Sequence, residues 1–238
     1  MSNYLFFDTE TTGNKDTDFL CQIAYKLGDT EFSELYKPES PIPPEASAVH
    51  HITNRMIADK PAFRESKDYA VVKSLFEGGV AIPVAHNAKF DIGMFKKEGI
   101  EIPKFICTLR LARHLDKEGV IPRYNLQFLR YYLDIDIDAQ AHDALGDVKI
   151  LEALFERLKT KMVKEMGDEE KALAEMLAVS ARPSLMRTFN FGKYLDKPIA
   201  DVAKTDAGYL KWLLDQKKQN PSDEEDWIYS LEYYLGKK

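Results

Sequence analysis

Four carboxylates and one histidine carry the most chemical information in this 238-residue chain. The acids are Asp8, Glu10, Asp91 and Asp147, and the histidine is His142. Each acid lies at the end of an apolar run, where an unpaired carboxylate is costly to bury. Several acids at one site repel one another unless cations lie between them. The pattern therefore predicts a site for a pair of divalent cations, of the kind that cuts phosphodiester bonds.

The first acid pair lies in the segment Phe-Phe-Asp-Thr-Glu-Thr-Thr-Gly, where Asp8 and Glu10 are two residues apart. On a strand, residues two apart point to the same side, so the two carboxylates would lie next to each other. Carboxylate oxygens suit Mg²⁺ or Mn²⁺ better than Zn²⁺. An isolated Asp-x-Glu is more often a surface pair. The apolar residues before it and the Thr-Thr-Gly after it make this one more specific.

Asp91 follows Ala-His-Asn-x-x-Phe and opens a segment with the pattern of an amphipathic helix. An acid in a first helical turn is favoured by the helix dipole, and that alone accounts for most aspartates so placed. The preceding pair His86-Asn87 favours a functional interpretation, because polar groups directly after a buried strand commonly line a cleft.

His142 and Asp147 lie five residues apart at the start of another amphipathic segment. Five residues do not match one helical face, so we expect His142 just before the helix or in its first turn, and Asp147 facing inward. A histidine has the near-neutral pKa that a base needs to take a proton from a bound water. The alternative is an exposed histidine that caps the helix.

Composition limits the class of protein. The net charge of −6 argues against a protein that coats long nucleic acid tracts, but not against a nuclease that binds one chain end. No apolar stretch reaches membrane-spanning length, and the amino terminus lacks the pattern of an export signal. Cys21 and Cys107 are expected to be reduced core thiols rather than a disulfide. A cytoplasmic location is predicted.

The hydrophobic pattern predicts an α/β domain. Strands are expected over 4–8, 17–27, 31–36 and 80–85, and helices over 64–77, 91–98, 109–115, 126–133 and 143–158. Three strands followed by alternating strand and helix indicate a mixed sheet with helices on both faces. Pro83 removes a hydrogen-bond donor, which suggests that the strand over 80–85 is an edge strand or starts late.

A change of composition near residue 160 predicts the domain organisation. We expect a main domain over 1–160, a helical linker over 161–186 and a small module over 187–238. Asp168 is a plausible helix cap in the linker. A module of about 50 residues would need to lean on the main domain or on a partner to be stable. Its many aromatic residues are expected to pack as a core rather than to stack on bases.

Taken together, the order and spacing of the three acidic segments resemble the DnaQ-like 3′→5′ exonucleases of the type with four acids and a histidine (DEDDh). The resemblance covers residues 4 to about 158 and implies an RNase H-like mixed sheet flanked by helices. It implies that Asp8, Glu10, Asp91 and Asp147 hold two Mg²⁺ or Mn²⁺ ions and that His142 is the general base. A sister subtype has tyrosine where this chain has Asp143.

The same resemblance implies residues that touch the terminal nucleotide of the substrate. They are Thr11, Thr12, His50, Asn87 and Phe90. His51 stands where the family's Val-His-Gly-Ile-Thr segment has glycine. Gly13-Asn14-Lys15 stands where some relatives carry an apolar wedge that separates base pairs, so Lys15 is a candidate phosphate contact.

The tail resembles the carboxy-terminal region of the exodeoxyribonuclease X family, through Arg-Pro-Ser-Leu-Met before Thr-Phe-Asn-Phe-Gly-Lys-Tyr and the later Gly-Tyr-Leu-x-Trp-Leu. The resemblance implies a metal-dependent exodeoxyribonuclease that releases nucleoside 5′-monophosphates from single- or double-stranded DNA 3′ ends. Three alternatives stay open. They are an RNA-trimming exonuclease of the same fold, a catalytically silent tether for nucleic acid or protein, and a module that recruits a protein partner.

Overall fold

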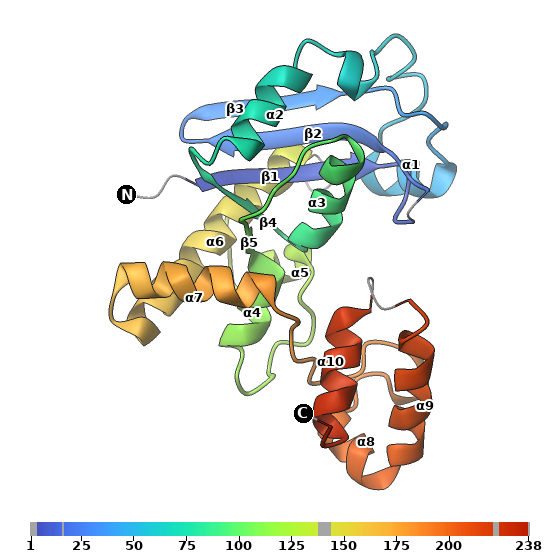
Figure 1. The fold of residues 1–238 in the computed structure, drawn as a ribbon, viewed down its shortest axis with the longest axis vertical. Coiled ribbons are helices and arrows are strands. Elements are labelled where there is room, and N and C mark those ends of the chain that lie inside the picture. The colour runs from blue at the N-terminus through green and yellow to red at the C-terminus, as the bar shows by residue number, and fades with distance from the viewer. Residues whose placement is uncertain (1–3, 16, 138–143, 221–223, 238) are drawn as a thin grey trace.

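A computed structural model describes residues 4–15, 17–137, 144–220 and 224–237. The chain forms a five-stranded sheet with helices on both faces, followed by a helical module at the carboxy-terminal end (Figure 1). The strands are β1 (Tyr4–Thr11), β2 (Leu20–Leu27), β3 (Thr30–Leu35), β4 (Ile82–Ala85) and β5 (Ile106–Cys107). The helices of the main part are α1 (Pro44–His50), α2 (Tyr69–Glu77), α3 (Ala88–Lys97), α4 (Thr108–Leu115), α5 (Leu126–Tyr132), α6 (Ala144–Met166) and α7 (Glu169–Ala181). The module contains α8 (Ile199–Thr205), α9 (Ala207–Lys217) and α10 (Glu225–Tyr234).

The sheet has the strand order β3-β2-β1-β4-β5. The strand β1 pairs antiparallel with β2 and parallel with β4, which confirms the predicted mixed sheet. Alternate residues of β1 face opposite layers of helices. Phe6 packs against Phe155 of α6 on one face, with ring centroids 5.4 Å apart. Phe7 packs against Phe95 of α3 on the other face, at 5.6 Å. The sheet is therefore covered on both sides, and its central strand is buried.

The strand β1 extends beyond its parallel neighbour. Its pairing with β4 ends at Phe6 and Val84, whereas its pairing with β2 continues to Thr11. The second half of β1 therefore has β2 on one side and no strand on the other. A register shift between Glu10 and Thr11 bends the strand near its end.

The strand β4 is not an edge strand, so that part of the expectation from Pro83 is wrong. It lies between β1 and β5. The ladder with β5 contains only the pairs of Val84 with Ile106 and of Ala85 with Cys107. At Pro83 the strand therefore has a neighbour only on the β1 side, which explains how a residue without an amide donor is tolerated inside the sheet.

The helices after the sheet cross the predicted domain boundary. The helix α6 continues past residue 160 to Met166, and Asp168 then caps α7 by accepting a hydrogen bond from the Lys171 amide at 2.9 Å. Met176 of α7 belongs to the same apolar core as α6, so the predicted linker packs on the main part of the chain. The division into domains stays a prediction. Within the described ranges, no helix is both long enough and apolar enough to span a membrane.

The module has a core of its own. Phe189 and Trp227 stack with ring centroids 5.6 Å apart, and only 1% and 8% of these residues are exposed. Leu210 of α9 and Leu231 of α10 close this core. The most buried aromatics of the module are thus used in packing.

Both cysteines are buried free thiols, as predicted. Cys21 lies on β2 and Cys107 on β5. Burial raises the pKa of Cys21 to about 12 and also raises the pKa of Cys107, so both side chains stay protonated at neutral pH.

Candidate active site

Three of the predicted acids meet at the end of β1 that extends beyond β4. Asp8 and Glu10 lie on the face of β1 that is covered by α6, and Asp147 lies in the first turn of α6. One carboxylate oxygen from each of the three residues lies within 4.8 Å of the other two. A strand with period two and a helix packed along it are therefore enough to bring residues distant in sequence to one point. This spacing allows the three side chains to share a cation.

Asp91 reaches the same region from α3. It lies in the first turn of that helix and is 3% exposed. Its Oδ1 atom accepts hydrogen bonds from the Thr9 amide at 3.1 Å and from the Thr9 hydroxyl at 2.7 Å. The Thr9 amide lies beyond the last β1–β4 pair, so the carboxylate takes the place of a missing strand neighbour. Asp91 is thereby fixed against the strand that carries Asp8.

Crowding of the acids makes it less favourable for each carboxyl group to be ionised. Burial, together with the nearby charges of Asp91, Glu10 and Asp147, raises the pKa of Asp8 well above its usual range. Burial also raises the pKa of Asp91 to about 7, even though the hydrogen bonds from Thr9 favour its ionised form. Divalent cations would relieve both effects, and a set of carboxylate oxygens suits Mg²⁺ or Mn²⁺. The residues present therefore fit the metal ions that the fold family implies.

Gln127 is a member of this region that the sequence did not reveal. Its Nε2 atom donates a hydrogen bond to Oδ1 of Asp147. Its Oε1 atom is buried and has no hydrogen-bond partner among the described residues. The Asn125 side chain caps α5 by accepting a bond from the Phe128 amide at 2.8 Å, which sets where the helix starts and so where Gln127 lies. Nothing in the sequence distinguishes Gln127 from other polar residues on a predicted helix.

The turn after β1 uses the two predicted threonines as structural groups. The Thr11 hydroxyl donates to the Gly13 carbonyl at 2.6 Å, and the Thr12 hydroxyl donates to Oδ1 of Asp18 at 3.1 Å. A Cβ atom on Gly13 would lie 2.6 Å from Oδ2 of Asp18 and would push that side chain away from its hydrogen-bond partners Thr12 and Lys15. Both threonines are buried. Their contact with a nucleotide stays a prediction.

His50 and His51 close the end of α1. The Ile52 amide donates to Nδ1 of His50 at 3.0 Å, so Nε2 carries the hydrogen and donates to the Thr11 carbonyl at 3.2 Å. Burial lowers the pKa of His50, which favours this neutral form. His51 adopts a left-handed backbone with φ of 63°, a conformation that glycine adopts without strain. The role predicted for His50 at the substrate stays a prediction.

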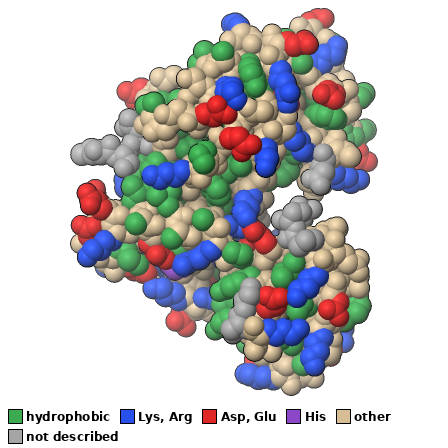
Figure 2. All heavy atoms as spheres, viewed as in Figure 1, with side chains coloured by type: hydrophobic (Ala, Val, Ile, Leu, Met, Phe, Trp, Pro, Cys, Tyr) green, Lys and Arg blue, Asp and Glu red, His purple; other side chains and the backbone are tan. Residues whose placement is uncertain are grey.

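Asn87 and Phe90 line a groove of about 1070 Å³ between the main part of the chain and the module. The hollow between the two parts is visible in Figure 2. Asn87 has a left-handed backbone with φ of 61° directly before α3. Because Asp91 follows within one turn of the same helix, the groove begins beside the acidic cluster.

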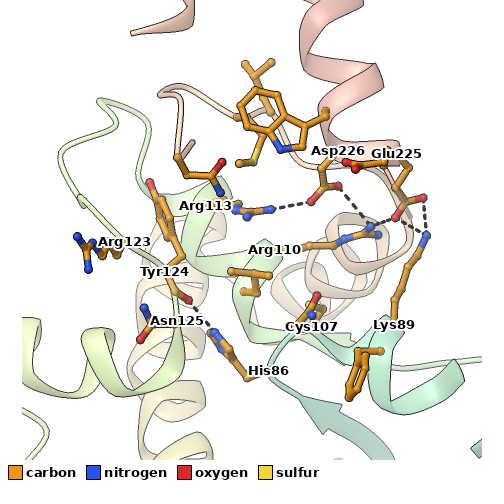
Figure 3. A pocket seen from close by; sticks show the side chains of 18 of the residues that line it. His86, Lys89, Cys107, Arg110, Arg113, Arg123, Tyr124, Asn125, Glu225 and Asp226 are labelled. Atoms are coloured by element: carbon orange, nitrogen blue, oxygen red, sulfur yellow. Dashed lines mark hydrogen bonds and ion pairs between the residues drawn. The ribbon is translucent and has the colours of Figure 1, made fainter. Parts of the chain in front are cut away.

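His86 also lines this groove and is held in its neutral form. Its Nε2 atom donates to the Tyr124 carbonyl at 2.7 Å, and its Nδ1 atom lies 2.9 Å from the Thr108 hydroxyl. Burial lowers the pKa of His86 to about 4, and the nearby Arg113 charge acts in the same direction. His86 therefore fixes the end of β4 to the loop before α5 (Figure 3).

A second charged cluster joins the module to the main part of the chain (Figure 3). Arg110, whose side chain is 5% exposed, pairs with Glu225 and Asp226 of α10. Arg113 pairs with Asp226 at 2.6 Å, and Lys89 pairs with Glu225 at 2.5 Å. Opposite charges alternate through this cluster, so it is compensated without a ligand.

The predicted site residues divide into three groups by position. Asp8, Glu10 and Asp147 meet at one point, and Asp91 lies beside them. The terminal-nucleotide candidates lie at the end of β1 and in the turn after it, at the end of α1 and in the groove. His142 lies outside the described residues, so its role stays a prediction.

Comparison with known proteins identifies the family. A family model described as "Exonuclease", of the RNase T type, matches residues 5–155. A second model, described as "Exodeoxyribonuclease X-like C-terminal", matches residues 189–218. The chain belongs to the RNase T/DnaQ-like exonuclease family. The family and the fold predicted from the three acidic segments and the tail are therefore confirmed, and so is the prediction of an exonuclease.

Individual relatives of this exonuclease agree with the family match. Exodeoxyribonuclease 10 of Escherichia coli (strain K12) is 36% identical over 188 residues, which cover 76% of this chain and 75% of the relative. DNA polymerase III subunit epsilon of Treponema pallidum (strain Nichols) is 32% identical over 175 residues, covering 68% of this chain and 78% of that protein.

Two solved structures share the fold. Exonuclease X in complex with 5′ overhanging duplex DNA matches with a TM-score of 0.56 and 28% identity, over 74% of this chain and 99% of that one. Escherichia coli exonuclease I in complex with a dT13 oligonucleotide matches with a TM-score of 0.59 and 21% identity, over 70% of this chain and 43% of that one. The second likeness shows the fold alone.

Proposed function

We propose that this exonuclease removes nucleotides from DNA 3′ ends and depends on two Mg²⁺ or Mn²⁺ ions. The observation that carries the proposal is the meeting of Asp8, Glu10 and Asp147 oxygens within 4.8 Å, with Asp91 fixed beside them. The raised pKa of Asp8 supports it, because a protein gains nothing in stability from crowding like charges. The names of the relatives support DNA as the substrate.

The four acids would hold the ions, and the residues around them would hold the acids. Thr9 fixes Asp91, and Gln127 fixes Asp147. When bound, the ions supply an acidified water and stabilise the charge on the leaving 3′ oxygen. In our proposal His142 takes the proton of the attacking water, and cleavage leaves the phosphate on the released nucleoside 5′-monophosphate.

Substrate recognition would take place where the groove meets the acidic cluster. Phe90 offers a ring for the terminal base, and Asn87 offers amide hydrogen bonds, since both residues line the groove next to Asp91. Ring stacking and backbone contacts do not read base identity, so sequence preference is expected to be weak.

The proposal is tested by Asp8→Asn in the presence of Mg²⁺. Loss of a cation ligand is expected to slow release of nucleotides from a 5′-labelled DNA oligonucleotide by about 10³-fold or more. Asp29→Asn is a matched control, because Asp29 is exposed in the turn between β2 and β3. Equal rates for the two variants would show that the site is wrongly placed.

The same assay tests the substrate and the base. A matched RNA oligonucleotide should be degraded more slowly than DNA, and faster degradation of RNA would point to an exoribonuclease of this fold. His142→Ala should slow hydrolysis while Mn²⁺ still binds. Loss of Mn²⁺ binding would instead make His142 a metal ligand.

A further inference from the structure

One face of helix α5 exposes aromatic rings next to the candidate active site. Tyr131 is 71% exposed and Tyr132 is 45% exposed. Phe128 lies one turn before Tyr132, and the two rings stack with centroids 5.6 Å apart and an interplanar angle of 21°. Together with Arg123, Asn125 and Gln127, these three aromatic residues line a shallow hollow of about 530 Å³. We call Arg123, Phe128, Tyr131 and Tyr132 the α5 surface.

The α5 surface is directly connected to the acidic cluster. Gln127, in the first turn of α5, donates to Asp147 and also lines the hollow. Residues four apart lie on the same side of a helix, so Tyr131 follows Gln127 on one face, about 6 Å further along the axis. A strand whose 3′ end lies at the carboxylates therefore has an aromatic surface within about one helical turn.

The charge of this hollow suits a polyanion. Its lining includes Arg123 and contains no acidic residue among the positions that the structure describes. Arg130 lies over the Tyr131 ring, with its guanidinium carbon 5.4 Å from the ring centroid. Arg123 lines both the hollow and the groove next to the module, and it points away from the Arg110–Asp226 pair (Figure 3).

The groove between the main part of the chain and the module is a weaker candidate for the same role. Its lining includes Glu224, Glu225 and Asp226, and three of its cations, Lys89, Arg110 and Arg113, are paired with the last two of these acids. A polyanion bound there would lie beside these acids, whereas the lining of the α5 hollow contains no acid among the residues that the structure describes.

We propose that the α5 surface binds the DNA strand on the 5′ side of its terminal nucleotide, by stacking unpaired bases on the exposed rings while Arg123 contacts the backbone. Aromatic rings beside cations are a common means of binding single strands, and ring faces are available only to bases that are not paired. The inference rests on the proposed function and narrows its substrate to strands with a single-stranded 3′ end.

Binding is measured first, because it does not require turnover. In an Asp8→Asn background, which prevents degradation, a 5′-fluorescein single-stranded DNA oligonucleotide is titrated and its anisotropy followed. The additional changes Tyr131→Ala and Tyr132→Ala should weaken binding about fivefold or more. Changing both tyrosines to Phe keeps the rings and should leave the Kd within about twofold. Tyr233→Ala is a matched control, since Tyr233 is 49% exposed on α10.

The active enzyme gives a second readout. The p-nitrophenyl ester of thymidine 5′-monophosphate contains only a terminal nucleotide, so the alanine pair should raise KM for the oligonucleotide and leave KM for the ester unchanged. The inference would be overturned if the double alanine variant left the Kd for the oligonucleotide unchanged. It would also be overturned if the double phenylalanine variant or Tyr233→Ala lost as much affinity for the oligonucleotide as the double alanine variant. If the parent hydrolyses neither substrate but the Kd shift is found, the proposed function fails and the DNA-binding surface stands.

Discussion

Two charged clusters in this molecule differ in the signs of their members. At the end of β1, Asp8, Glu10 and Asp147 bring like charges within 4.8 Å, and Asp91 adds a fourth. Between α4 and α10, cations and acids alternate. Both clusters contain partly buried acids, so the degree of burial does not explain the difference.

The pKa values show what each arrangement does. Burial and neighbouring acids raise the pKa of Asp8, so its charge is disfavoured. Burial acts in the same direction on Glu225, yet Lys89 and Arg110 hold the pKa of that residue below its usual value. In a cluster of alternating charges, each charge is neutralised by a partner within the protein, and the ion pairs hold one part of the chain against another. In a cluster of like charges, the charges are not neutralised within the protein, which is explained by the binding of a ligand of opposite charge.

The largest effect on stability is expected from the paired cluster. Arg110→Ala would remove a buried cation from the partly exposed Glu225 and Asp226, and would remove the hydrogen bond to the Ser180 carbonyl. We expect the free energy of unfolding to fall by about 3–5 kcal/mol, as measured by urea titration.

The matched control for that change is Arg64→Ala. Arg64 pairs with Glu98 at 3.0 Å, but its side chain is 56% exposed. An exposed pair contributes about 0–1 kcal/mol, so a loss as large as that of Arg110→Ala would remove the distinction between buried and surface pairs.

A somewhat smaller effect is expected from His86, which lies near Arg113 of the paired cluster. Its pKa is lowered from 6.5 to about 4, so between these values the unfolded chain binds the proton and the folded chain does not. Without metal, the raised pKa values of Asp8 and Asp91 act in the opposite direction over this range, because these acids bind protons more readily in the folded chain. The contribution of His86 alone to stability should fall as the pH drops from about 7 to about 4, by about 3 kcal/mol at most. Urea titrations in EDTA at several pH values measure this loss.

The variant His86→Gln isolates that contribution. It lacks the titrating ring, so the stability of the parent relative to this variant should fall as the pH drops over the same range. Parallel pH profiles would show that His86 is not the group responsible.

The smallest expected effect on stability is an increase, caused by a change in the acidic cluster. In EDTA, Asp8→Asn removes one of the repelling charges and should stabilise the protein by about 1–2 kcal/mol. Asp226→Asn, the same chemical change in the paired cluster, should destabilise it. Thermal and urea unfolding show whether each variant is more or less stable than the parent. Destabilisation by Asp8→Asn without metal would contradict the view that this cluster is strained until a ligand binds.

Local patterns were sufficient to predict the parts of the site that depend on one element. Asp8 and Glu10 share a strand face because strands repeat every two residues, and Asp91 opens α3 where the polarity pattern placed a helix. The family resemblance supplied the convergence of these segments, which no single segment contains.

Pairings between distant residues could not be predicted in this way. Arg110 and Asp226 are separated by 116 residues, and neither lies in a motif. Gln127 meets Asp147 only because of how α5 packs near α6. The prediction of an edge strand from Pro83 was wrong for the same reason, because the length of β5 decides whether β4 has a neighbour on both sides at Pro83.

Calorimetric titration of Mn²⁺ into the parent and into Asp8→Asn tests the central claim most directly. The account predicts that the parent binds Mn²⁺ and that Asp8→Asn weakens this binding by about tenfold or more, while Asp29→Asn does not. Equal Mn²⁺ affinity in the parent and in Asp8→Asn would contradict it.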